Sequence, residues 1–123
     1  CTLYLEKMEA ANQAAREAVT ANDVFGLVEA NHEFHMHFAR CSRNEFLIRA
    51  VNDIRTEAKR LSYLSYDNVI DPRHPLEIHY ESVVGEHDRI IDGLARKDAK
   101  QVKQLICGHI QTFRDRIIVF MTS

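Results

Sequence analysis

The 123-residue chain contains no tryptophan, only two prolines and only four glycines. Both prolines, Pro72 and Pro75, lie in one short stretch, so the rest of the chain lacks the residue that most strongly breaks helices. No apolar run approaches the ~20 residues that a membrane-spanning helix requires, which argues against a membrane protein. The net charge of -2 argues against a surface that binds nucleic acid on its own.

Cysteine is also scarce. The three cysteines are odd in number and show no Cys-x-x-Cys spacing, which favours a reducing, cytoplasmic compartment over a disulfide scaffold. The length suits a single domain over residues 1–123, and a hydrophobic share of 46% can supply its core. Because the chain opens at Cys1 rather than at a methionine, we expect a fragment of a longer protein.

Away from the prolines, apolar residues recur with a period near 3.6, which predicts an all-α fold. Five helices are expected, and they cover about residues 2–20, 24–40, 43–66, 76–96 and 99–121. The stretch 67–75 is the one clear loop, because both prolines disfavour helix at the residue before them. Short connections between long helices predict antiparallel neighbours, and hence an antiparallel helical bundle.

Polar residues mark where three of these helices begin. Asn22 or Asp23 can cap the second helix. Ser42, with a glutamate three residues later, has the spacing of a capping box for the third, and Asp98 is placed to cap the fifth. The third helix is expected to bury one stripe, which consists of Leu47, Val51, Ile54, Ala58, Leu61 and Ser65.

Three of the seven histidines fall on faces that helical periodicity turns inward. His87 and His109 each lie in the middle of an apolar stripe, on the fourth and fifth helices. His35 lies on the inward face of the second helix, one turn after Asn31, whereas His37 falls on a polar face. Two interpretations remain open: three separate core histidines, each bonded to a neighbour, or one metal site built by three helices.

A zinc-protease motif is excluded at the same place. His32 and His35 flank a glutamate, but they are three residues apart. The His-Glu-x-x-His motif requires a separation of four, so that both imidazoles share a helix face.

The ordered set of short motifs resembles a known family. The motifs are Asn31-x-x-Phe34-His35, Cys41-Ser42-Arg43-Asn44, Glu86-His87 with Ile90, Lys97-Asp98-Ala99 and His109-Ile110. Together they resemble the FCD domain, the C-terminal effector-binding domain of FadR-type regulators in the GntR family of bacterial transcription factors. The resemblance extends from about residue 5 to residue 120 and implies an all-α bundle that binds a divalent metal and a small metabolite.

The resemblance also implies a ligand set. The aspartate and three histidines that hold the metal in this family fall on Asn31, His35, His87 and His109. Asn31 replaces the family's aspartate, so we expect lower metal affinity and greater reliance on an anionic ligand. Zinc, nickel, manganese and iron all suit such a set. A second departure, Arg43 where the family often has glycine, lies in a turn.

The family places a winged helix-turn-helix DNA-binding domain before this domain, and neither it nor the first effector-domain helix has a counterpart here. The resemblance therefore implies a homodimeric sensor of a small organic acid, which contacts DNA only through a missing N-terminal domain. Arg55 and Tyr66 are candidate effector-binding residues, although a solvated helix edge is the favoured interpretation of both. The alternatives are a metal-free structural dimerisation domain and a metal-dependent hydrolase, for which no convincing general base is visible.

Overall fold

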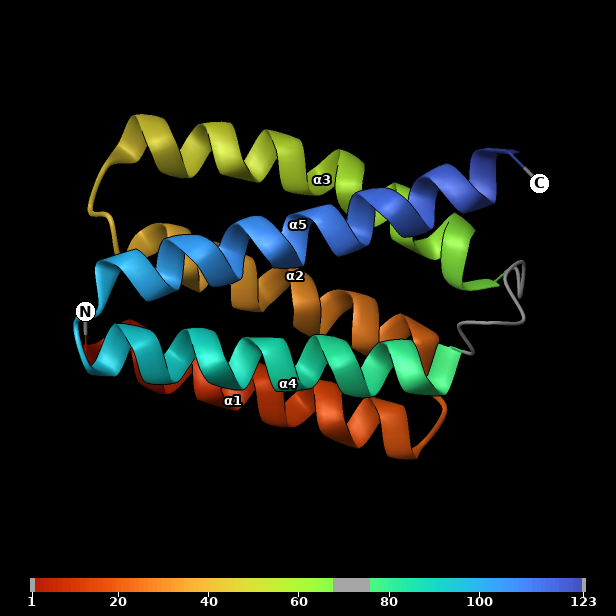
Figure 1. Cartoon of the computed structure of the whole chain (residues 1–123), viewed down its shortest axis with the longest axis horizontal. Helices are drawn as coiled ribbons and strands as arrows, with labels where there is room; N and C mark the ends of the chain where they lie inside the picture. The colour runs from red at the N-terminus through yellow and green to blue at the C-terminus, as the bar shows by residue number, and fades with distance from the viewer. Residues whose placement is uncertain (1, 68–75, 123) are drawn as a thin grey trace.

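The computed structural model describes the backbone of residues 2–67 and 76–122, and the side chains of residues 2–63, 81–115 and 118. Its five helices are α1 (Thr2–Thr20), α2 (Val24–Arg40), α3 (Glu45–Asp67), α4 (Leu76–Ala95) and α5 (Ala99–Thr122). Consecutive helices run in opposite directions (Figure 1). The predicted all-α antiparallel bundle is therefore confirmed, and the helix bounds agree with the expected ones to within two residues.

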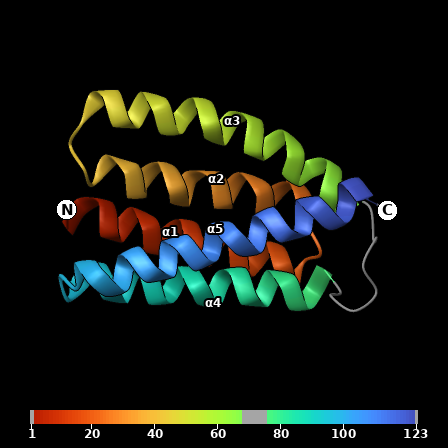
Figure 2. The same cartoon turned by 45° about the horizontal axis from the view of Figure 1, so that its top comes forward.

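The helices follow one another around the bundle in the order α3, α2, α1, α4, α5. The contact that closes this ring, between α5 and α3, is the weakest of those between neighbours. Both views show α3 beside α2 at the outer edge of the bundle (Figures 1 and 2). The bundle is therefore open along the line where α3 and α5 face each other.

Most of the buried apolar side chains in the described part of the chain lie on α1, α2 and α4. Small residues on α1, among them Ala15 and Ala18, pack against Leu27 and Val28 of α2. Alanine favours helix and lets two helix axes approach closely, which explains the alanine-rich sequence of α1. Phe34 of α2 and Met8 of α1 are fully buried, and they anchor the second apolar cluster.

Two of the three predicted caps are confirmed. The Asp23 carboxylate accepts a hydrogen bond from the Gly26 amide at 2.9 Å, and Asp98 accepts one from the Gln101 amide at 3.1 Å. The predicted capping box of Ser42 is wrong. The Asn44 side chain caps α3 instead, by accepting from the amides of Phe46 and Leu47.

The physical reason lies in the turn. Ser42 donates its hydroxyl to the Ala39 carbonyl at 2.7 Å, so it closes the end of α2. Arg43 follows with a φ of 55°, a left-handed conformation that separates Ser42 from the first turn of α3. Ser42 therefore cannot reach the amides that a cap must satisfy.

The predicted inward stripe of α3 is only partly right. Leu47 and Ile54 are 45% and 66% exposed, whereas Val51, Ala58 and Leu61 are half-buried, and the side chain of Ser65 lies outside the described residues. The stripe does face inward, but the ring is open beside it, and four of its members line a cavity.

Two further sequence expectations can be compared with the structure. None of the helices in the described part of the chain is long and apolar enough to cross a membrane. Cys107 is a free, exposed thiol, but Cys41 is disulfide-bonded, which departs from the expectation drawn from the cysteine count.

Candidate metal centre

The three histidines selected by helical face come together in the structure. His35 of α2, His87 of α4 and His109 of α5 are all buried, and their ligand nitrogens lie within 4.8 Å of one another. The Nε2 atom of His109 lies 3.1 Å from Nε2 of His35 and 3.3 Å from Nε2 of His87. Histidines that lie between 22 and 74 positions apart in the sequence thus point the same ring atom at one place.

The two separations from His109 fit the coordination shell of a metal ion, whereas the third, between His35 and His87, is bounded only at 4.8 Å. With bonds of about 2.0–2.1 Å, two imidazole nitrogens lie about 2.9 Å apart at a right angle and about 3.3 Å apart at the tetrahedral angle. The two measured separations, 3.1 and 3.3 Å, fall within this interval.

His87 is held by an asparagine from α1. The Asn12 amide group donates its hydrogens to the Val84 carbonyl at 3.2 Å and to the Asp88 carboxylate at 2.7 Å. Its oxygen, 3.1 Å from Nδ1 of His87, can only accept, so His87 carries its hydrogen on Nδ1. The lone pair of His87 Nε2 is therefore turned toward the centre.

His109 is held in the same way by a carboxylate from α4. Nδ1 of His109 donates to Glu86 at 2.5 Å. Burial raises the pKa of Glu86, but the hydrogen bond and the charge of His109, together with Arg89 and Ser82, more than offset this, so its pKa is lowered and it stays ionised. In the neutral ring, Nε2 of His109 therefore also presents a lone pair.

The two lone pairs create an electrostatic problem. Neutral rings of His87 and His109 direct their Nε2 lone pairs at each other across 3.3 Å, which is repulsive unless a positive charge lies between them. A metal ion or a shared proton would remove the repulsion. An outward Nδ1–H bonded to a carboxylate or amide oxygen is the usual support of a metal-bound histidine.

Burial keeps two of the rings uncharged. It lowers the pKa of His35 and of His87 well below the usual value of 6.5, because a charged imidazole loses its hydration in the core. The positive charge of Arg55 lowers the pKa of both rings further. Neutral imidazole is the form that binds metal, so both rings are available as ligands near neutral pH.

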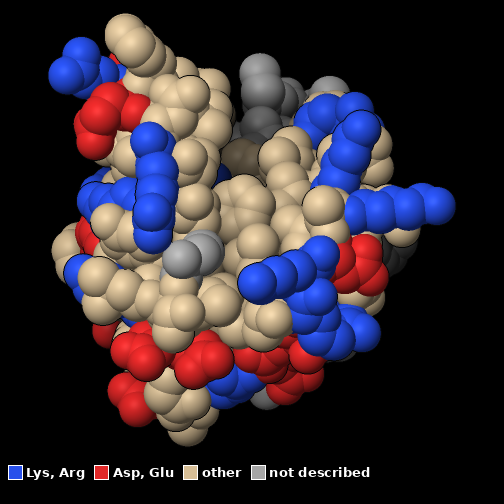
Figure 3. Space-filling view, turned by 90° about the vertical axis from the view of Figure 1, so that its left-hand side faces the viewer, with Lys and Arg blue, Asp and Glu red and all other residues tan. Residues whose placement is uncertain are grey.

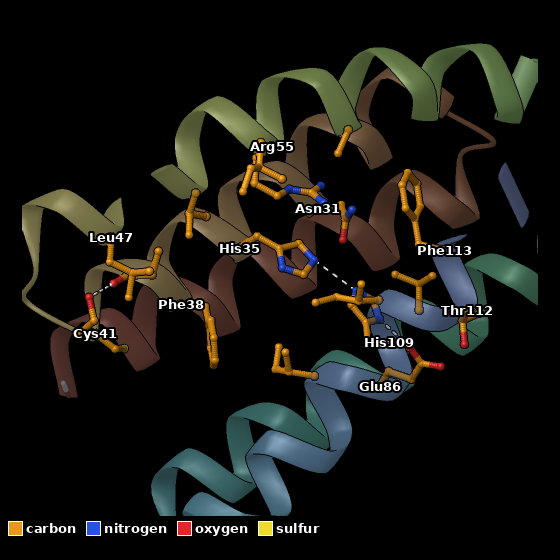
Figure 4. Close-up of a pocket in the computed structure, with 18 of the residues that line it drawn as sticks. Asn31, His35, Phe38, Cys41, Leu47, Arg55, Glu86, His109, Thr112 and Phe113 are labelled. Atoms are coloured by element: carbon orange, nitrogen blue, oxygen red, sulfur yellow. Dashed lines mark hydrogen bonds and ion pairs between the residues drawn. The ribbon is translucent and has the colours of Figure 1, made fainter. Parts of the chain in front are cut away.

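Asn31 lies in the same cavity as the histidines, one helical turn before His35. It is 8% exposed, and its Oδ1 has no hydrogen-bond partner among the described residues. Figure 4 shows this oxygen turned to the side on which His35 and His109 lie. A buried carbonyl oxygen without a partner costs free energy, and a cation would satisfy it.

The centre opens into a cavity of about 630 Å³ between α2, α3, α4 and α5. Arg55 extends into this cavity from α3, on the side of Asn31, while Glu86 lies beyond His109 (Figure 4). Arg55, Asn31, His35 and His109 thus line one cavity. The Tyr66 side chain lies outside the described residues.

Of the other histidines, His32 and His37 have described side chains, and neither belongs to the centre. His37 contacts Glu33 at 3.6 Å and Arg40 at 3.0 Å, on the polar face where it was predicted. His32 is half-buried, and its Nδ1 has no partner among the described residues. The side chains of His74 and His79 lie outside the described residues.

Sequence reasoning missed the two residues that orient the rings. Asn12 follows Met8 by one turn and precedes Ala15 by three residues, so its place on the buried face of α1 was a usable signal. Glu86 had no such signal. It points about 100° away from His87 around α4, and only the packing of α4 on α5 brings it to His109.

Comparison with known families identifies the domain. The FCD domain family matches residues 3–112, which is most of the chain. No match was found among curated proteins or among solved structures. The match covers all three buried histidines, Asn31 and the two residues that orient the rings. The chain belongs to the FCD domain family.

Proposed function

We propose that the chain is the metal-dependent sensing domain of a GntR/FadR-type transcriptional regulator, and that its effector is a small organic acid. The observation that carries this proposal is the pair of Nε2 lone pairs held 3.3 Å apart by Asn12 and Glu86. A divalent ion between His35, His87 and His109 accounts for that geometry. Zinc, nickel, manganese and iron all suit the donor set.

The donor set favours an anionic effector. Three imidazoles and the Asn31 amide are neutral, so they leave the charge of a divalent ion uncompensated. When bound, the ion would supply a Lewis-acidic position for a carboxylate oxygen. Arg55 lines the same cavity and can add a charge-assisted hydrogen bond, and Tyr66 remains a second candidate effector-binding residue.

In the proposed regulator, residues 1–123 form one sensing domain of a cytoplasmic homodimer. DNA is bound by a separate winged-helix domain that precedes this one. Effector binding changes the packing of the helices around the centre, and the change repositions the DNA-binding domains. No catalytic role is proposed, because Glu86, the carboxylate beside the centre, is already bonded to His109 and is not free to act as a base.

The test is a thermal-unfolding screen of the untagged chain with organic acids, performed with added metal and with a chelator. A ligand that binds only the folded, metal-loaded protein raises Tm in the first condition and not in the second. The His87→Ala and His109→Ala variants should lose the effect. Equal stabilisation by acids in chelator, or in both variants, would contradict metal-dependent sensing.

A further inference from the structure

The cavity beside the candidate centre has two chemically different parts. Its polar part is formed by Asn31, His35, Arg55, Glu86 and His109. The remaining wall is mainly apolar and consists of Phe38, Ala39, Cys41, Ser42, Leu47, Val51, Ile54, Ala58, Val83, Leu94, Ile106, Ile110, Thr112 and Phe113. A ligand that fills this cavity must therefore combine a polar end with an apolar body.

The longest apolar part runs from the histidines toward the α2–α3 turn. Val51 and Leu47 lie one and two helical turns before Arg55 on α3, and Leu94 lies two turns after His87 on α4. Eight residues of helix, from Arg55 back to Leu47, correspond to about 12 Å. The cavity volume of about 630 Å³ falls within the range of sites for ligands of drug-like size. Acetate-sized acids would leave most of this space unfilled.

The two hydroxyl groups in the described part of the cavity wall already donate hydrogen bonds within the protein. Ser42 donates its hydroxyl hydrogen to the Ala39 carbonyl at 2.7 Å, and Thr112 donates to the Gly108 carbonyl at 3.0 Å. A hydroxylated ligand body would therefore find few partners along the apolar part. Each unpaired hydroxyl weakens binding by roughly tenfold, because its hydrogen bonds to water are lost.

The charged residues of the cavity wall determine which group suits the polar end of the ligand. Arg55 and Glu86 are the charged residues of the cavity wall in the described part of the chain, and the negative charge of Glu86 is directed at His109. At the molecular end toward which the apolar part runs, basic side chains flank an uncharged area, and acidic side chains gather along its lower edge (Figure 3). Within the described part of the cavity wall, Arg55 is therefore the charge that can attract an anion.

We propose that the effector is a monocarboxylate with an unsubstituted hydrocarbon body, in preference to a very short or polyhydroxylated acid. This proposal rests on the proposed function, because it assumes that the carboxylate meets the metal centre and Arg55. The hydrocarbon body lies against Phe38, Leu47 and Val51.

The test is isothermal titration calorimetry of the zinc-loaded chain with acetate, butyrate, hexanoate, octanoate and gluconate. Affinity should rise about fourfold for each added methylene from acetate to octanoate. Hexanoate and gluconate have equally long carbon chains and one carboxylate each, so they isolate the effect of hydroxyl groups. Gluconate should bind at least tenfold more weakly than hexanoate.

Adjacent residues on α3 provide a matched pair of variants. Leu47 lines the cavity, whereas Phe46 is 82% exposed and does not. Leu47→Gln should weaken octanoate roughly fivefold and leave acetate unchanged, because only the longer acid reaches this position. Phe46→Gln should affect neither acid. Phe46 is 82% and Leu47 45% exposed, so neither change removes a side chain from the buried core.

The outcomes separate the ligand class from the metal requirement. Equal affinity for acetate and octanoate, or tighter binding of gluconate than of hexanoate, would overturn the ligand class and leave metal-dependent sensing intact. A dependence on chain length that persists in chelator would overturn the metal requirement and support the ligand class. Binding of no carboxylate would overturn both. The chain could also form a dimer that Leu47→Gln dissociates but octanoate does not. That result would assign the cavity to a contact with a second copy of the chain and would overturn the proposal.

Discussion

Asn12 and Glu86 determine which nitrogen of His87 and of His109 faces the centre. An unsupported imidazole can exchange its hydrogen between the two ring nitrogens, and only one of the two forms directs an Nε2 lone pair inward. Asn12 is 1% exposed and makes three hydrogen bonds, so its orientation is fixed by its surroundings. Asp88, which accepts a hydrogen bond from Asn12, also pairs with Arg16 at the surface. The contacts that fix Asn12 therefore reach the outer side of α1.

Replacing Asn12 by leucine should weaken metal binding ten- to hundredfold, the usual cost of removing a residue that orients a metal-bound histidine. Affinity is measured by competition with a chelator of known strength. Gln13→Leu, which changes an exposed neighbour on α1, is the control and should leave affinity unchanged. Nitrogen NMR of His87 adds an independent readout, because loss of Asn12 should allow hydrogen on Nε2. Unchanged affinity in Asn12→Leu would show that the asparagine is only structural.

A substitution at Asn31 tests whether the neutral donor set leaves the charge of the metal ion uncompensated. Asn31→Asp places a carboxylate where a neutral amide oxygen now lies, so metal affinity should rise by at least about tenfold. The same change should weaken binding of the organic acid, since the metal's charge is already partly compensated. Competition with a chelator measures the first effect and calorimetry the second. A fall in metal affinity would refute the proposed role of Asn31.

The site could be predicted from the sequence only in part. The three histidines were identifiable because a polar residue in the middle of an apolar stripe is visible from periodicity alone. Glu86 was not, because its contact with His109 depends on how α4 and α5 pack, which the sequence of neither helix specifies. Asn12 was identifiable as buried, but its partner lies seventy-five positions away on α4.

At the level of helices, local sequence determined most of what was predicted correctly. Caps such as Asp23 and Asp98 are local, because donor and acceptor are three residues apart. The error at Ser42 is also local. Ser42 and Asn44 are both good capping residues, and the left-handed turn at Arg43 decides in favour of Asn44.

The approach of α4 to α5 depends on one glycine. A Cβ atom added at Gly93 would lie 2.9 Å from a methyl group of Val102, whereas one added at Gly108 would meet nothing within 4 Å. Gly93→Ala should therefore destabilise the protein by about 1 kcal/mol, since overpacking exceeds the gain in helix propensity. Gly108→Ala should stabilise it by up to about 1 kcal/mol. Urea unfolding measures both, and equal stabilisation by the two changes would contradict the close approach.

At the scale of the whole molecule, the ring of helices is complete except between α3 and α5. Periodicity correctly predicted that the apolar face of α3 lies toward the bundle, but it could not predict that Leu47 and Ile54 would border a cavity. Whether an apolar stripe meets another helix or an open space depends on all five helices together. That arrangement is also what brings three distant histidines to one point.

The buried histidines should make the metal-free protein sensitive to acid. The pKa of His35 and of His87 is lowered well below 6.5 in the fold, so below about pH 6.5 the unfolded chain binds protons that the folded chain does not. Stability should be fully present above that pH and should fall below it. The slope is at most about 1.4 kcal/mol per pH unit for each of the two imidazoles.

Urea unfolding in chelator, at about pH 7.5 and about pH 5.5, measures this slope. The His87→Gln variant removes one of the two groups and should reduce the slope by about half. A free energy of unfolding that does not change over this interval would contradict the buried, neutral state of the rings.

The most direct test of the central claim is the metal content of the chain purified without a histidine tag. Elemental analysis, followed by anomalous scattering from crystals, gives the amount, identity and position of any bound ion. The structure predicts about one divalent transition-metal ion per chain, between His35, His87 and His109, and its loss in His109→Ala. A folded chain that stays metal-free after incubation with excess zinc, nickel, manganese and iron would contradict a metal centre and favour a proton shared between the rings. That result would contradict metal-dependent sensing.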